Sequence, residues 1–271
     1  MKNSSKIIWA IALIVIVVLI GVLVFGYYKK INLKIDNPVA TMEVENFGTI
    51  KLELYPDQAP QTVSNFIALA NRGFYDGLTF HRIIKDFMIQ GGDPNGDGTG
   101  SAKISNLKDD GEDTKYTIKG EFSANNVKNT VKMEEGTLAM ARSDYTQQSS
   151  SLTEESYNSG SCQFFIVTKA ASYLNGQYTG FGKVIQGLDV VHKIEEVEVK
   201  AADTSSDTES SSNSEASTPV NPPKITSIRV ETNGVDYGLP ETLTPFDYTS
   251  WMYKQYGIDP SSLSTTTTVD E

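Results

Sequence analysis

Cysteine and histidine are scarce in this sequence, which has one cysteine, Cys162, and two histidines in 271 residues. A single cysteine cannot form an internal disulfide, and it excludes a cysteine-based zinc site. Basic residues are also in deficit, because 23 Lys and Arg stand against 34 Asp and Glu and leave a net charge of -11. Nucleic-acid binding needs clustered cations, so the composition predicts no nucleic-acid partner and no attraction to anionic lipid head groups.

The longest run without charge lies near the N-terminus. Residues 7–28 carry no charged side chain, and about 20 apolar residues are enough to cross a hydrocarbon core of about 30 Å. A cleaved secretory signal is the alternative, but its apolar region is usually about 7–15 residues long and ends at a small-residue site. We therefore predict a short tail at 1–6, an uncleaved transmembrane signal anchor at 7–28 and a juxtamembrane linker at 29–38.

The pattern that follows predicts many short strands and two helices. Ile50, Leu52 and Leu54 alternate with polar residues, which indicates a half-buried strand in a hairpin over residues 40–54. Further strands are predicted at 80–84, 87–90, 116–118, 137–141, 163–167, 180–185 and 224–230. Helical spacing of apolar residues predicts one helix with Val63, Phe66, Ile67 and Ala70, and a later one with Val190, Val191, Ile194 and Val197. This combination favours an all-β barrel or sandwich with helices at its open ends.

Three polar or irregular segments accompany this pattern. Residues 147–160 are rich in serine, and residues 203–219 have too little apolar surface to fold, so both are predicted to be mobile surface inserts. The first insert lies close in sequence to the candidate substrate-binding residues given below, and we expect it to overhang them. The C-terminal tail, 232–271, carries several aromatic side chains. We expect this tail to pack back on the domain or to meet a partner.

The stretch from Phe80 to Asp93 places one cation, Arg82, beside large apolar side chains and an amide, Gln90. Without a paired nucleophile and base, this set is poorly suited to hydrolysis. It suits a reaction that breaks no bond, such as rotation about a prolyl peptide bond, whose barrier is about 18–20 kcal/mol. In the twisted transition state the lone pair returns to the nitrogen, so a donor aimed at that nitrogen stabilises the transition state and not the planar ground state. Arg82 is the predicted donor.

The same residues resemble the signature of the cyclophilins, a class of peptidyl-prolyl cis-trans isomerases. Five motifs occur in the family's order between about Val39 and Glu231: residues 80–93, 120–122, 138–142, 163–166 and 181–184. The resemblance implies a mainly β fold, an eight-stranded antiparallel β-barrel capped by two helices, over residues 39–231. It also implies an isomerase without a cofactor or metal, acting on proline-containing polypeptides and assisting their folding.

Site residues follow from the same resemblance. Arg82, Phe87 and Gln90 are the predicted catalytic residues, with Gln90 orienting Arg82 and the substrate carbonyl. Substrate binding is assigned to Met88, Met140, Ala141, Arg142, Gln163, Phe165, Tyr173, Leu174 and Tyr178. Tyr173 stands where many cyclophilins have a Trp that contacts cyclosporin, and Tyr178 where many have a His. We expect catalysis to survive these changes, whereas cyclosporin binding stays open. Arg142 replaces a common Asn, as in bacterial-like members.

Several residues also have ordinary interpretations. An arginine on a strand is usually a surface ion pair, and His81 is expected to be a structural histidine with its hydrogen bonds satisfied. His192 is expected to be solvated and Cys162 inert. Residues 93–98 open like a calcium loop, but the twelfth position is Ile104 where a Glu is needed, so we predict no calcium site.

Topology and function retain alternatives. Lys2 and Lys6 precede the apolar run and three lysines follow it, so the positive-inside count is close to balanced and leans slightly against an exported domain. Because anchored prolyl isomerases commonly face outward, we expect a single-pass cell-membrane protein with an extracytoplasmic domain and exported substrates. The rival hypothesis is a tethered proline-peptide-binding chaperone or scaffold, in which turnover is incidental.

Overall fold

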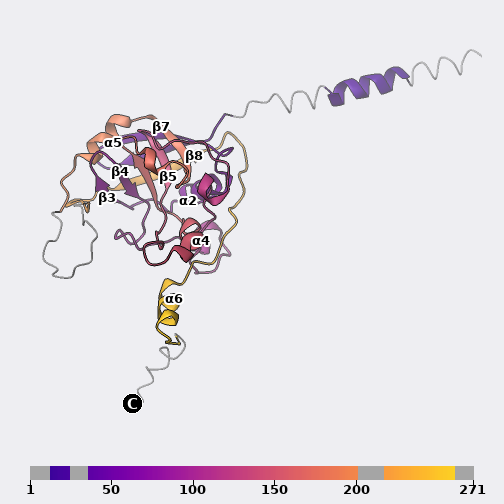
Figure 1. The fold of residues 1–271 in the computed structure, drawn as a ribbon. Coiled ribbons are helices and arrows are strands. Elements are labelled where there is room, and N and C mark those ends of the chain that lie inside the picture. Colours follow the sequence, from indigo (N-terminus) through magenta and orange to yellow (C-terminus); the bar gives the residue numbers. More distant parts are fainter. Residues whose placement is uncertain (1–12, 25–35, 201–216, 260–271) are drawn as a thin grey trace, which may run out of the picture. The chain divides into compact units, whose positions relative to one another are not determined.

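The computed structural model describes residues 13–24, 36–200 and 217–259 (Figure 1). The chain divides into two compact units, Met1–Asp36 and Asn37–Glu271. In the first unit residues 13–24 form a helix whose large apolar side chains are exposed. Within the described ranges, no helix combines the length and apolar character needed to cross a membrane. The remaining parts of the predicted anchor, 7–12 and 25–28, lie outside the described residues.

The second unit is built on one eight-stranded antiparallel sheet that curls into a half-barrel (Figure 1). The strands are β1 (Val39–Val44), β2 (Gly48–Leu54), β3 (Phe80–Ile84), β4 (Met88–Gly91), β5 (Thr137–Met140), β6 (Phe164–Val167), β7 (Gly180–Gln186) and β8 (Ile225–Glu231). Their order across the sheet is β3-β4-β6-β5-β7-β2-β1-β8. A bridge between Thr79 and Lys224 brings the β3 end of the sheet to the β8 end. The mainly β, antiparallel class predicted from the sequence is confirmed.

The inner face of the sheet carries the main core because alternate strand residues point inward. Phe66 lies at its centre, with ring centroids 5.3 Å from Tyr75, 5.7 Å from Phe164 and 5.4 Å from Phe181. Gly182 in β7 permits close strand packing, since a Cβ there would lie 2.6 Å from the carbonyl oxygen of Glu53. A side chain at this position would therefore push β7 away from β2.

Two helices, α2 (Pro60–Asn71) and α5 (Leu188–Glu195), cover opposite ends of the curled sheet (Figure 1). The predicted apolar residues of both helices are buried in the main core, apart from the half-buried Val197 beyond α5. The other named helical elements are α3 (Ile104–Leu107), η1 (Ser123–Asn125), η2 (Ser150–Leu152), α4 (Thr153–Tyr157), η3 (Ser172–Leu174) and α6 (Tyr248–Gln255).

The N-terminus of α2 is capped from a distant loop. Ala59, the residue before the helix, has no side-chain acceptor. The buried carboxylate of Glu121 takes that place, accepting from the backbone N–H of Gln61 at 3.0 Å and of Thr62 at 2.8 Å, and from the Thr62 hydroxyl at 2.7 Å. A carboxylate satisfies the free N–H groups and the positive end of the helix dipole. In the Gly120-Glu121-Phe122 motif, the central residue therefore has a structural role, which is to cap α2.

Two sequence expectations change in the loops. Residues 116–118 form no ladder strand; Thr117 and Ile118 instead make isolated bridges to Leu243 and Gly160. The insert 147–160 takes regular structure as η2 and α4, with Leu152 and Ser156 buried. Its predicted mobility stays a prediction. Most of the second insert, 203–216, lies outside the described residues.

Within the described residues, the part of the C-terminal tail from 232 to 248 packs back on the domain, which was one of the two outcomes expected for its aromatic residues. The hydroxyl of Ser64 donates to the Gly238 carbonyl at 2.9 Å, and the Glu241 N–H donates to the side-chain oxygen of Gln61 at 2.6 Å. Both Ser64 and Gln61 belong to α2. The tail therefore runs along this helix before it reaches the loops at the edge of the sheet.

Candidate active site

The site is a row of side chains on the outer face of the sheet. Strand register places Arg82 of β3 opposite Gln90 of β4, Gln90 opposite Phe165 of β6, and Phe165 opposite Ala139 of β5. Cross-strand partners on one face lie about 4.5–5.5 Å apart at Cβ. The ladder itself therefore brings the arginine, the amide and an aromatic ring together from segments more than 80 residues apart in sequence.

A pocket of about 200 Å³ opens above this row. Its lining residues are Arg82, Phe87, Met88, Gln90, Ala141, Arg142, Phe165, Leu174 and Tyr178. Every one of them was predicted from the sequence to act on the substrate. A small cluster of buried apolar side chains on the outer face, including Met88 and Phe165, forms its floor. We call this space the Arg82 pocket.

Arg82 is half-buried at the wall of the pocket. One guanidinium nitrogen donates to the thioether sulfur of Met88 at 3.8 Å. A thioether is a weak acceptor, so this contact positions the guanidinium while its positive charge still faces the apolar pocket. An arginine stays protonated at any pH that proteins encounter, which makes Arg82 a permanent hydrogen-bond donor and never a proton-transfer group.

Gln90 is held by a second amide. Its side-chain nitrogen donates to the Gln163 side-chain oxygen at 2.9 Å, and Gln163 in turn donates to the carbonyls of Gly98 and Gly100 at 3.0 and 2.9 Å. The predicted Gln90–Arg82 pair are cross-strand partners in the ladder. Gln163 does not line the Arg82 pocket; it fixes the Gln90 amide and lines the neighbouring cavity.

The glycine-rich loop that supports Gln163 is organised by Asp93. This buried carboxylate accepts from the backbone N–H groups of Asn95 at 2.9 Å, Asp97 at 3.0 Å and Gly98. Before it, Gly92 has a φ of +83°, and a Cβ there would lie 2.6 Å from the Cys162 carbonyl oxygen. Among the described residues no three His, Cys, Asp or Glu side chains gather as metal ligands would. The Asp93 carboxylate is thus used to turn the loop.

Arg142 lies at the junction between the Arg82 pocket and its neighbour. Its guanidinium carbon is 4.5 Å from the ring centroid of Tyr178 and 5.3 Å from that of Tyr157. Its Nε donates to the Gln177 carbonyl at 3.2 Å. Cation–π contacts hold an arginine without neutralising it, so Arg142 adds positive charge at the edge of the pocket.

Besides Gln163, two predicted substrate residues lie outside the Arg82 pocket. Met140 points to the opposite face of β5 from Ala139 and is buried in the main core, so the structure does not bring it into the Arg82 pocket. Strand alternation is the reason. Tyr173 is 69% exposed at the rim, where its ring centroid is 6.1 Å from that of Phe87. It extends the apolar surface outside the pocket.

The hairpin that carries Arg82 is anchored to α5, a support that sequence reasoning missed. Asp86, with φ of 58°, forms the β3–β4 turn, and its N–H donates to the buried carboxylate of Glu195 at 2.7 Å. The hydroxyl of Thr168 donates to the same oxygen. Lys85 and Glu196 form a 2.7 Å ion pair beside them. No local signal links Glu195 to the turn, because 109 residues separate them.

The two histidines and the cysteine have structural surroundings. Within the described residues His81 is buried with neither ring nitrogen hydrogen-bonded, so the expected satisfied histidine is not found. Burial lowers the His81 pKa, against the attraction of Asp93. His192 is not merely solvated, because its ring nitrogens lie 3.1 Å from Glu195 and 3.0 Å from Glu135. Burial raises the pKa of Cys162 to about 12, so it remains an unreactive thiol.

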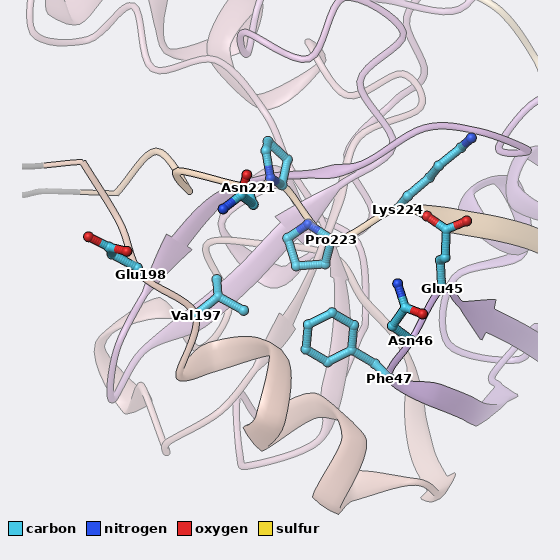
Figure 2. A pocket seen from close by; sticks show the side chains of 9 residues that line it. Glu45, Asn46, Phe47, Val197, Glu198, Asn221, Pro223 and Lys224 are labelled. Carbon is cyan, nitrogen blue, oxygen red and sulfur yellow. The ribbon is translucent and has the colours of Figure 1, made fainter.

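A further pocket of about 390 Å³ lies away from this row (Figure 2). Figure 2 shows Phe47 below Pro223, with Glu45 and Lys224 on one side and Glu198 on the other. None of the residues that line it was predicted to act on a substrate. Its size alone does not make it the catalytic site, because its lining contains no arginine.

Comparison with known proteins agrees with the geometry. The family model described as "Cyclophilin type peptidyl-prolyl cis-trans isomerase/CLD" matches residues 39–230. Peptidyl-prolyl cis-trans isomerase B of Bacillus subtilis is 42% identical over 146 residues, which cover 54% of this chain and 82% of that protein. Peptidyl-prolyl cis-trans isomerase-like 2 of Rhizopus delemar is 37% identical over 177 residues, covering 65% of this chain. The chain spans 28% of that fungal relative's length.

The solved structures give the same result. The crystal structure of a cyclophilin type peptidyl-prolyl cis-trans isomerase from Cryptosporidium parvum, in the presence of the dipeptide Ala-Pro, matches with a TM-score of 0.54. The identity is 27%, and the match covers 72% of this chain and 99% of that chain. The chain belongs to the cyclophilin-type peptidyl-prolyl cis-trans isomerase family.

Proposed function

We propose that this protein accelerates cis-trans isomerisation of Xaa-Pro bonds in polypeptides, with Arg82 as the catalytic residue. The observation that carries the proposal is the Arg82 guanidinium beside an apolar pocket of about 200 Å³. The pocket suits a proline ring, because its floor is apolar. No proton transfer or covalent step is needed, which fits a site whose two cations, Arg82 and Arg142, are permanently protonated arginines.

The barrier to be lowered is electronic. In the planar ground state the nitrogen lone pair is delocalised into the carbonyl, whereas at the twisted transition state it is localised on nitrogen and can accept a hydrogen bond. The Arg82 guanidinium stabilises that localised lone pair. Gln90, fixed by Gln163 at 2.9 Å, presents its side-chain oxygen and positions the polar side of the peptide. Because the donors are already oriented, the protein pays little reorganisation cost at the transition state.

The apolar residues hold the ring while the peptide turns. Phe165 and Tyr178 meet edge to face at 5.7 Å, and Leu174 and Phe87 complete the walls. Burial of a proline ring against these side chains gains about 25 cal/mol per Å² of apolar surface. The ring is thereby fixed, so rotation takes place on the carbonyl side, next to Arg82 and Gln90.

The test compares wild type with Arg82→Ala in an NMR exchange measurement on a short Xaa-Pro peptide. We expect wild type to accelerate exchange far above the uncatalysed time of tens to hundreds of seconds. Loss of the guanidinium is expected to lower kcat/KM by about 100- to 1,000-fold, the usual effect of removing one transition-state donor. Unchanged exchange in a folded Arg82→Ala variant would contradict the assignment.

The matched control is Arg229→Ala. Arg229 is also a strand arginine, but it pairs with Asp76 at 2.6 and 2.7 Å and lies outside the Arg82 pocket. Its loss should lower stability somewhat and leave kcat/KM unchanged. If wild type binds the peptide but does not accelerate exchange, the tethered proline-peptide binder becomes the better description.

Membrane attachment and export belong to the same proposal. We propose that the apolar run 7–28 anchors a bacterial-like enzyme to the cell membrane, with the isomerase domain outside and exported proteins as substrates. Support comes from the described helix 13–24, whose large apolar side chains are 51–72% exposed and need a nonaqueous surrounding or a partner. Recovery of the full chain in the soluble fraction would contradict anchoring. Proteolysis at 203–219 only after cell lysis would contradict the outward orientation.

A further inference from the structure

A second cavity, of about 440 Å³, adjoins the Arg82 pocket. The two spaces share three lining residues, Gln90, Ala141 and Arg142. We call the second space the tail-side cavity, because Pro245 and Phe246 of the C-terminal tail line it. A peptide advances at most about 3.3–3.6 Å per residue. Because the two spaces share a wall, a segment whose proline occupies the Arg82 pocket can place the side chain of a nearby residue in this cavity.

The tail residues that line the cavity are fixed in place. Thr117 and Leu243 exchange two backbone hydrogen bonds, of 3.0 and 2.8 Å, just before Pro245. The ring centroid of Phe246 lies 5.4 Å from that of Tyr145. Tyr248 stacks on the same Tyr145 ring, with a centroid distance of 5.7 Å and an interplanar angle of 6°. Tyr145 itself lines the cavity. The tail and the loop before the first insert thus form one aromatic wall.

The cavity carries positive charge on a molecule that is acidic as a whole. The chain has a net charge of -11, yet the residues lining the cavity include two cations, Lys115 and Arg142, and no carboxylate. Neither cation has an ion-pair partner within the described residues. The nearby carboxylate of Asp144 accepts from the Thr146 N–H at 3.0 Å, and that of Asp97 from the Thr99 N–H at 2.9 Å. The positive charge of Arg142 also helps to lower the Asp144 pKa, after the hydrogen bonds from Thr146. Asp144 therefore offsets part of the charge of Arg142, and Lys115 is the cation with no such partner among the described residues.

We propose that the C-terminal tail is a specificity element of the substrate site, and that the tail-side cavity selects an acidic side chain close to the proline. This inference rests on the isomerase function proposed above and names its substrate class. Lys115 and Arg142 attract the carboxylate, and the Phe246–Tyr145 wall excludes water on one side. Exclusion of water strengthens the attraction, because the interaction of two charges grows as the local dielectric falls.

The test measures kcat/KM of the full chain on a peptide series. Each peptide has one proline and one Glu, placed at each of three positions before and after it, and each is paired with the same peptide carrying Gln. We expect one Glu position to exceed its Gln partner by roughly three- to tenfold, the range of a partly screened ion pair. Lys115→Gln should abolish that preference while activity on the Gln peptides stays the same.

The wall is tested separately. Phe246→Ala should lower kcat/KM on the preferred Glu peptide to near that of its Gln partner, since water then enters the cavity. Two matched controls lie elsewhere: Lys224→Gln removes a lysine at the pocket of Figure 2, and Tyr256→Ala removes an aromatic ring of the tail that is 76% exposed. Both controls should keep the wild-type preference.

Each result separates this inference from the isomerase function. Activity on all peptides without any Glu preference overturns the inference and leaves the isomerase in place. Equal gains on every peptide in Phe246→Ala would identify the tail as an obstruction, which also overturns it. If wild type accelerates no peptide, the isomerase proposal fails. The Glu preference is then read from binding of the same peptide pairs by NMR shifts, where equal binding would overturn it.

Discussion

Phe164 and Phe165 are adjacent in sequence and have opposite tasks. Phe164 points to the inner face, where its ring meets Phe66 at 5.7 Å, Tyr75 at 5.6 Å and Phe80 at 6.3 Å. Phe165 points to the outer face, where it lines the Arg82 pocket and meets Tyr178. Both side chains are almost fully buried. Burial alone therefore does not separate a core residue from a site residue.

The difference lies in what fills the space around each ring. Phe164 is surrounded by protein on all sides, so its removal leaves an enclosed apolar cavity. Phe165 forms part of a pocket that is open to a ligand. The inner face is thus fully packed, which favours stability. The outer face is packed incompletely, and a bound proline ring can fill the space that remains.

The sharpest test of this comparison is the pair Phe164→Ala and Phe165→Ala. Loss of Phe164 should lower the free energy of unfolding by about 3–5 kcal/mol, because an enclosed cavity remains. Loss of Phe165 should cost about 1–3 kcal/mol, because water or neighbouring side chains can enter from the pocket. Urea denaturation measures both values.

The effects of these two substitutions on activity should be the reverse of their effects on stability. Phe165→Ala should lose most of its kcat/KM on Xaa-Pro peptides, whereas any folded fraction of Phe164→Ala should retain it. Phe164→Leu provides a variant that keeps most of the core volume if the alanine variant does not fold. Equal losses of stability and activity in the two positions would remove the distinction between the faces.

A smaller effect is expected at the α2 cap. Glu121→Gln retains the shape of the side chain but removes the charge that faces the helix N-terminus and one of its acceptor oxygens. We expect a loss of about 1–2 kcal/mol in the free energy of unfolding, with kcat/KM unchanged because Glu121 does not line the Arg82 pocket. Glu134→Gln, at an exposed carboxylate, is the matched control. Equal denaturation midpoints for the two variants would contradict the capping role.

The smallest effects concern pH, where the two histidines act in opposite directions. Burial lowers the His81 pKa from 6.5, so the unfolded chain binds more protons between the lowered pKa and 6.5, and stability falls as the pH drops through that window. Hydrogen bonds to Glu195 and Glu135 raise the His192 pKa from 6.5. Its stabilising contribution is complete below 6.5 and is lost as the pH rises through the raised value.

Urea denaturation over a range of pH around 6.5 separates the two contributions. His81→Gln should flatten the decline of stability on the acid side, and His192→Gln should flatten the decline on the alkaline side. The two variants serve as controls for each other. Parallel pH profiles for wild type and both variants would show that neither histidine contributes in this way.

Much of the site could be predicted from the sequence because its residues occur in short motifs with a local signal. The stretch 80–93 contains the hairpin, the arginine and the amide, and alternation already indicates which residues share a face. The same alternation explains why Met140 lies outside the Arg82 pocket: it follows Ala139 on the strand and points to the other face. Its assignment to substrate binding stays a prediction. A motif identifies a segment, but the direction of each side chain depends on strand register.

By itself, the sequence determined the fold class, both helices, most strands and the nine residues of the Arg82 pocket. It did so because periodicity, turn residues and motif order are local properties of the chain. The tertiary structure alone decided which distant groups support them: Glu121 at the start of α2, Glu195 at the turn of the Arg82 hairpin, and Phe246 at the wall of the tail-side cavity. Such partners are separated by about 60 residues or more and share no local pattern, so only the folded chain brings them together.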